Sequence, residues 1–119
     1  MTTRVFEARV RHQPHVAILD LRGEMNALAE NVLNAAYDEA ISKQPEMILL
    51  NFSQVDYINS TGIALVVGLL KRARQANCAL AACGLSDHYQ EIFQITRLSD
   101  FIRMFPDEAS ALGDQHSTL

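Results

Sequence analysis

The residues best placed to do chemistry form the polar run Asn59-Ser60-Thr61-Gly62, which directly precedes a strongly amphipathic segment. Serine and threonine hydroxyls can be phosphorylated, and a phosphate adds about −1.5 to −2 charges. Ser60 is also the best candidate for the N-cap of the following helix, its hydroxyl accepting from the backbone N–H of Gly62 or Ile63. A helix N-terminus tolerates a phosphate, because its N–H groups and dipole favour negative charge. We therefore expect phosphorylation at Ser60, with Thr61 as second choice, although a purely structural cap is the alternative.

Other catalytic and ligand-binding arrangements are missing from the sequence. Ser60 does not lie in a Gly-x-Ser-x-Gly elbow, and no histidine spacing pairs one of the four histidines with it. Histidines and cysteines form no metal-binding pattern, and no phosphate-binding loop occurs. A receiver domain would need an acidic pair after the first strand and a proline-containing loop after the acceptor, and the sequence has neither. We expect no enzymatic activity, no metal and no cofactor.

Composition indicates one globular domain. The 119 residues leave no room for a second core, and 49% of them are hydrophobic. A net charge of −4, without a basic stripe, argues against direct binding of nucleic acid. No signal peptide and no apolar run of about 20 residues occurs, so we expect a cytoplasmic protein that does not enter a membrane. Cys78 and Cys83 should be buried on opposite faces of one strand, unpaired.

The elements that position these residues alternate along the chain. Apolar alternation and short apolar runs predict strands over 5–10, 15–23, 46–52, 78–84 and 101–104. Helical spacing and capping residues predict helices over 28–42, 60–75 and 86–98, and a last helix with Pro106 in its first turn. We expect an α/β fold, with a mixed, mostly parallel sheet of about four to five strands, an antiparallel edge strand and about four helices. The core should span about 4–112, with a frayed tail over 113–119.

The helix expected from Ser60 to Gln75 has two different faces. A helical wheel places on its core-facing stripe Ile63, Val66, Val67, Leu70 and Ala73. The opposite face carries Thr61, Ala64, Gly68, Lys71, Arg72 and Gln75, with Leu65 on the flank. Small residues let another backbone approach closely, so this face is a candidate docking surface. The structural alternative is that Ala64 and Gly68 pack under the terminal helix.

A resemblance to a known family rests on the runs MILLNFSQVDYINSTGIALVVGLLKRAR, ALAACGLSDHYQEIFQITRLSDFIRMFPDEASAL and LRGEMNALAENVLNAA. Together they cover nearly the whole chain and resemble the STAS domain of bacterial anti-sigma factor antagonists. The resemblance implies the STAS fold and, as partner, an anti-sigma factor that is also an ATP-dependent serine kinase. Binding would free a sigma factor, and phosphorylation of Ser60 by the kinase would end the binding. A metal-dependent phosphatase would restore it.

Partner-binding residues are expected around Ser60, namely Glu24, Asn26, Asp56, Asn59, Thr61, Gly62, Ala64, Leu65, Gly68 and Arg72. Glu24 would close a turn or lie on the rim, and Asp56 could equally accept from loop N–H groups. The family often has aspartate where this chain has Asn26 and Asn59. These exchanges reduce repulsion of an ATP phosphate but also remove polar contacts to a kinase. The alternatives are a STAS scaffold or small-ligand-binding subunit that is never phosphorylated, and a weak homodimer through Leu65.

Overall fold

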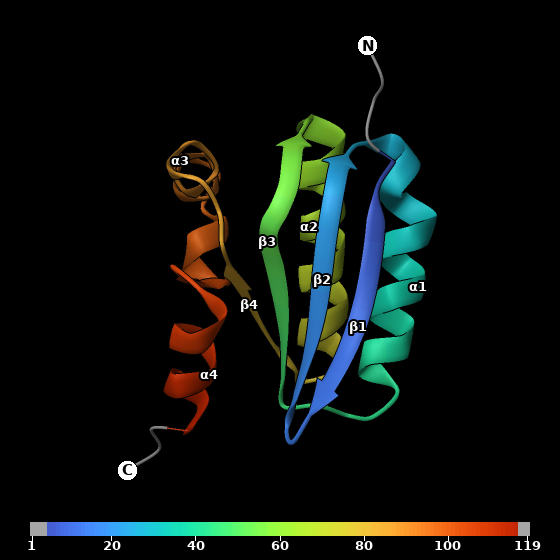
Figure 1. Ribbon diagram of the computed structural model, residues 1–119, viewed down its shortest axis with the longest axis vertical. Coiled ribbons are helices and arrows are strands. Elements are labelled where there is room, and N and C mark those ends of the chain that lie inside the picture. The colour runs from blue at the N-terminus through green and yellow to red at the C-terminus, as the bar shows by residue number, and fades with distance from the viewer. Residues whose placement is uncertain (1–4, 117–119) are drawn as a thin grey trace.

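The structure, a computed structural model, describes residues 5–116 of the chain. A five-stranded sheet carries helices on both faces, and Figure 1 shows α1 and α2 together behind β1, β2 and β3. The strands are β1 Glu7–Gln13, β2 Val16–Met25, β3 Met47–Ile58, β4 Ala79–Cys83 and β5 Arg103–Phe105. The helices are α1 Glu30–Ile41, α2 Ser60–Gln75, α3 Asp87–Ile95 and α4 Glu108–His116, with the short 3-10 turns η1 Ala27–Ala29 and η2 Leu98–Asp100.

The strands are ordered β1-β2-β3-β4-β5, with β1 antiparallel to β2 and all other pairs parallel. The predicted α/β fold with an antiparallel edge strand is therefore confirmed. Pro14 and His15 make the tight turn between β1 and β2, where His15 adopts a φ of 69°. Each parallel pair needs a crossover, and α1, α2 and α3 supply these connections.

Two hydrophobic clusters lie on opposite faces of the sheet. The larger one packs under α1 and α2, and the smaller one packs between the sheet and Ala111 of α4. Successive strand residues point to opposite faces, which places Cys78 in the larger cluster and Cys83 in the smaller one. Both cysteines are buried and unpaired, as predicted. Burial raises the pKa of the Cys83 thiol to about 11, so this thiol is neutral at physiological pH.

Strands β2 and β3 are longer than predicted, and this brings the parallel pair up to the candidate site. β2 continues past Gly23 to Met25, and β3 continues to Ile58, with two register shifts between them. Gly23 has a φ of +93°, and an added Cβ would lie 2.4 Å from the backbone oxygen of Val5. Glu24 therefore lies within a strand, opposite Tyr57, and does not close a turn. Both strand ends carry polar side chains, so the apolar pattern did not predict them.

The start of the first helix also differs from its prediction. Leu28, where we predicted the helix to begin, belongs to η1 and is 87% exposed. Val32 is likewise exposed, and the residues of α1 that face the core are Leu33, Ala36, Tyr37 and Ala40. The true stripe keeps the spacing of three and four residues but begins later, because a 3-10 turn precedes the α-helix.

The core-facing stripe of α2 is rotated from its predicted position. Its buried side chains are Val66, Leu69, Leu70 and Ala73, whereas Val67 is 38% exposed. Gly68 does not pack under the terminal helix, because an added Cβ would meet nothing within 4 Å and α4 covers the opposite face of the sheet. The predicted outer face of α2 is therefore open along Ala64 and Gly68.

The last helix begins at Glu108, later than predicted. Asp107 accepts the N–H of Ser110 at 2.8 Å, so Pro106 precedes the cap and is not in the first turn. The helix also continues beyond Gly113 to His116, where we predicted a frayed tail, and residues 117–119 lie outside the described residues. Arg11 of β1 forms an ion pair with Glu108, which ties the helix to the sheet.

Candidate functional site

Asn59, and not Ser60, is the N-cap of α2. Its side-chain oxygen accepts the N–H of Gly62 at 2.9 Å, and its backbone oxygen accepts the N–H of Ile63 at 3.0 Å. The backbone N–H of Asn59 donates to the carbonyl of Met25 at 3.2 Å, at the end of the neighbouring strand. Because β3 runs to Ile58, a single extended residue connects strand and helix, and Asn59 occupies that position.

Ser60 is consequently the first residue of the helix, and its side chain is exposed. Within residues 5–116, no group is hydrogen-bonded to its hydroxyl. Thr61 is exposed beside it. The first N–H groups of a helix have no acceptor within the helix, so an anion at this position meets backbone donors and the positive end of the dipole. The hydroxyl of Ser60 is free of the capping role and open to solvent.

Gly62 shapes this site from inside. It is buried, and an added Cβ would lie 2.3 Å from the carbonyl oxygen of Met25 and 2.9 Å from the side chain of Ile58. The first turn of α2 can lie this close to β2 only because the side chain is missing. Gly62 therefore positions its neighbours and offers no side chain to a partner.

A rim beside Ser60 is built by the end of β2. The side chain of Asn26 accepts the N–H of Leu28 at 2.9 Å and so caps η1, which packs against α2. Leu28 is exposed on this capped turn. Local sequence periodicity did not predict that Leu28 is a surface residue. Its exposure depends on how the neighbouring elements pack.

Helix α3 fixes the strand that leads to Ser60. The hydroxyl of Tyr89 accepts the backbone N–H of Ile58 at 2.9 Å. Asp56 is exposed and lines a small hollow of about 180 Å³ that also includes Ser86 and Tyr89. The sequence pattern did not predict this contact, because it joins residues 31 positions apart.

The predicted docking residues of α2 separate into open and occupied positions. Ala64 is exposed, and Leu65 and Gly68 are half-buried. The guanidinium of Arg72 forms an ion pair with Asp38, lies 3.4 Å from the side-chain oxygen of Asn34 and sits 4.3 Å above the ring of Tyr37. Arg72 thus joins α2 to α1 and is already occupied within the chain.

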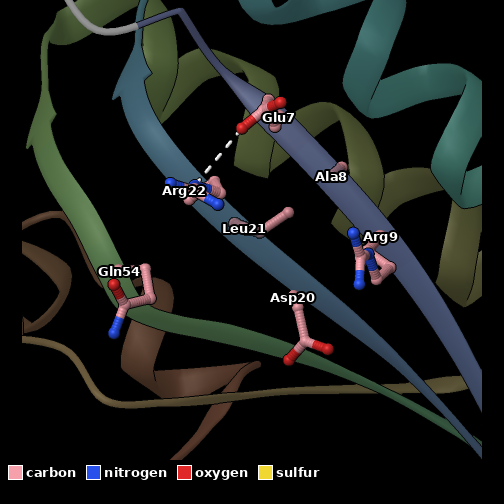
Figure 2. Close-up of a pocket in the computed structure, with 7 residues that line it drawn as sticks. All are labelled: Glu7, Ala8, Arg9, Asp20, Leu21, Arg22 and Gln54. Carbon is pink, nitrogen blue, oxygen red and sulfur yellow. Dashed lines mark ion pairs between the residues drawn. The ribbon is translucent and has the colours of Figure 1, made fainter.

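A second hollow, of about 350 Å³, lies over β1, β2 and β3, away from Ser60. Figure 2 shows Glu7 and Arg22 paired across its upper end, with Arg9, Asp20 and Gln54 around it. Asp20 is also held by Arg11, through bonds of 2.6 and 2.9 Å. The charged side chains around the hollow are largely paired within the chain, so the hollow offers no arrangement of catalytic groups.

Two further tests concern the described part of the chain. No group of three or more histidine, cysteine, aspartate or glutamate side chains is placed there to hold a metal ion. None of the described helices combines the length and the apolar character that crossing a bilayer requires.

Comparison with known proteins identifies a matching family and two similar proteins. Residues 7–111 match the family described as STAS domain. The chain is 32% identical over 108 residues to the anti-sigma-B factor antagonist of Listeria monocytogenes, covering 91% of this chain and 94% of that protein. It is 31% identical over 86 residues to the putative anti-sigma factor antagonist BtrV of Bordetella bronchiseptica, covering 72% of each chain.

Solved structures share the fold. An anti-sigma factor antagonist from Mycobacterium paratuberculosis superposes with a TM-score of 0.79 at 14% identity, over 92% of this chain and 93% of that one. The unphosphorylated form of the anti-sigma factor antagonist SpoIIAA superposes with a TM-score of 0.72 at 18% identity, over 97% of this chain and all of the other.

Proposed function

The chain belongs to the STAS domain family, and from this membership we propose that it is an anti-sigma factor antagonist. The unphosphorylated chain binds an anti-sigma factor that is also a serine kinase, and this binding releases a sigma factor. Phosphorylation of Ser60 ends the binding, and a metal-dependent phosphatase restores it. The names of the two relatives support the role of antagonist. The chain acts as a substrate and switch, with ATP and magnesium belonging to the kinase.

One observation carries this proposal: Asn59 caps α2 and leaves the Ser60 hydroxyl exposed. A serine that served as the cap would have to give up its hydrogen bond when modified, and loss of a cap costs about 1 kcal/mol. Here the cap is made by another side chain. The helix can therefore keep its N-terminus while the neighbouring hydroxyl gains a phosphate.

The switch itself follows from charge and desolvation. Leu28 and Ala64 are exposed apolar side chains on the elements that flank Ser60. A partner surface that covers them is largely apolar. A phosphate at Ser60 adds about −1.5 to −2 charges, which such a surface would have to desolvate without compensation. Binding is lost although the fold of the antagonist is kept.

The neutral side chain of Asn59 favours this switch. Its amide oxygen accepts from Gly62, a contact that a carboxylate would also make. A carboxylate, however, would place a second negative charge next to the phosphate on Ser60. Asparagine provides the cap without this repulsion. The exchange of the family's aspartate is therefore compatible with phosphorylation.

The test is phosphorylation of the purified chain by each candidate anti-sigma kinase of the same organism, with ATP and magnesium. Intact mass and peptide mapping should show one phosphate at Ser60, which Ser60→Ala abolishes. Thr61→Ala is the matched control and should be modified normally. Binding of the same kinase should be lost once the phosphate is present.

Two other results would contradict the switch. Modification at Thr61 alone would move the acceptor by one residue. Tight binding of a kinase without any modification would favour the second function, that of a STAS scaffold that is never phosphorylated in its working cycle.

A further inference from the structure

An exposed apolar and basic surface lies at the far end of α2 from Ser60. Phe101 follows η2 and is 54% exposed, and Val67 of α2 is 38% exposed. The guanidinium of Arg74 lies 5.0 Å from the centre of the Phe101 ring, which connects α2 with this segment. Aromatic residues and arginine are enriched in protein–protein interfaces. We call this region, formed by Val67, Lys71, Arg74 and Phe101, the Phe101 surface.

The part contributed by α2 forms one continuous stripe. Val67, Lys71 and Arg74 are spaced by four and three residues and therefore lie on the same side of the helix. All three are exposed, and Ala64 continues the stripe toward Ser60. With a rise of about 1.5 Å per residue, Arg74 lies about 21 Å from Ser60 along the helix.

The positive charge of this surface is uncompensated within the described residues. Arg11, Arg22, Arg72 and Arg97 each form an ion pair with an acidic side chain. Lys71 and Arg74, in contrast, have no acidic partner among residues 5–116. The chain as a whole carries a net charge of −4. Two neighbouring cations on an acidic protein, beside exposed apolar side chains, call for a partner that brings carboxylates and apolar groups together.

We propose that the Phe101 surface docks an acidic amphipathic segment of a protein partner. Its apolar side chains cover Phe101 and Val67, and its carboxylates pair with Lys71 and Arg74. The inference goes beyond the proposed function, because it needs no phosphate on Ser60. The distance to Ser60 exceeds the Debye length of about 8 Å at physiological ionic strength. This docking point therefore holds a partner in both states of the switch.

A protein partner fits better than an anionic membrane. A membrane surface would attract Lys71 and Arg74 but repel the excess of acidic residues on the rest of the chain. Peptide carboxylates can instead be placed individually beside the two cations.

The experiment is an NMR titration of the full chain with a synthetic amphipathic helical peptide built from leucine and glutamate. Amide signals of Phe101, Val67 and the Lys71 to Arg74 turn should shift. Phe101→Ser and Arg74→Glu should each weaken binding about tenfold or more, as expected for a hot spot. Phe101→Leu, which keeps an apolar side chain, should lose less. Arg9→Glu is the matched charge reversal on the opposite side of the sheet and should leave binding unchanged.

Several results would overturn the inference. The same peptide with lysine in place of glutamate must not bind, and equal binding of both peptides would exclude charge recognition. Signals that shift elsewhere, or an equal effect of Arg9→Glu, would exclude this surface. Anionic phosphatidylglycerol vesicles that bind through the same residues would identify a membrane site. None of these results touches the phosphorylation test at Ser60, so the two proposals fail separately.

Discussion

The hydroxyl of Tyr89 accepts the backbone N–H of Ile58 at 2.9 Å, two residues before Ser60. This bond joins α3 to the last residue of β3 and so fixes the strand end from which the candidate site starts. The position of Ser60 therefore depends on an element that follows it by more than twenty residues.

Removal of this hydroxyl should destabilise the chain. Tyr89→Phe leaves the buried end of β3 with an unsatisfied N–H, which costs about 1–3 kcal/mol. Urea unfolding followed by circular dichroism measures the change. Tyr57→Phe is the control, because Tyr57 is 53% exposed and its variant should unfold like the parent protein. Equal stability of both variants would show that the bond contributes nothing.

Substitutions at Asn59 should separate capping from charge. Asn59→Ala removes the bond to Gly62 and should lower the free energy of unfolding by about 1 kcal/mol. Asn59→Asp keeps an acceptor there, so the unphosphorylated variant should melt close to the parent temperature. After phosphorylation of Ser60, Asn59→Asp should melt lower than the phosphorylated parent, because two negative charges are adjacent. A higher melting temperature would contradict this account of Asn59.

Two glycines of the same helix should respond in opposite directions. Gly62→Ala forces a methyl group against the Met25 carbonyl and should destabilise the chain by about 1–3 kcal/mol. Gly68→Ala meets open space and should stabilise it by about 0.5–1 kcal/mol, because alanine is the better helix former. Thermal melts of the two variants make a matched comparison. Destabilisation by Gly68→Ala would mean that the position is crowded.

The buried hydroxyl of Tyr37 should lower the free energy of unfolding of the chain. Its ring is buried under Arg72, and within the described residues the hydroxyl oxygen has no hydrogen-bond partner. Burial also raises the pKa of this hydroxyl. Tyr37→Phe should therefore raise the free energy of unfolding by about 1 kcal/mol, since an unsatisfied polar group leaves the core. A loss of stability in urea would show that the hydroxyl is satisfied in solution.

The buried thiol of Cys83 should make the chain sensitive to alkaline pH. Its pKa rises from the ordinary value of 9.0 to about 11 because burial disfavours the thiolate. The folded state therefore holds the proton more tightly than the unfolded state. This contribution is complete below about pH 9 and is lost as the pH rises toward about 11. Cys83→Ala should flatten the decline of the melting temperature over this range. An unchanged decline would assign it to other groups.

The sequence by itself determined the order of the elements and the sheet class. Strand and helix periods, the apolar runs of β3 and β4 and the capping side chain of Ser86 are local properties, so the pattern predicted the type and order of the strands and α-helices, although it ended β3 too early. The sequence also predicted that α2 begins at Ser60, because a polar run between an apolar strand and an amphipathic helix indicates the start of that helix.

Tertiary structure decided which side chains perform the roles. Asn59 became the cap because the pairing with β2 extends β3 to Ile58. Arg72 pairs with Asp38 and is therefore not available on the open surface of α2. Leu28 lies in a 3-10 turn and is therefore exposed and not part of the core. Phe101 lies beside Arg74 only because the tertiary fold brings these two residues, 27 positions apart in the chain, together. Each of these outcomes depends on contacts between residues far apart in the chain, and local periodicity carries no information about such contacts.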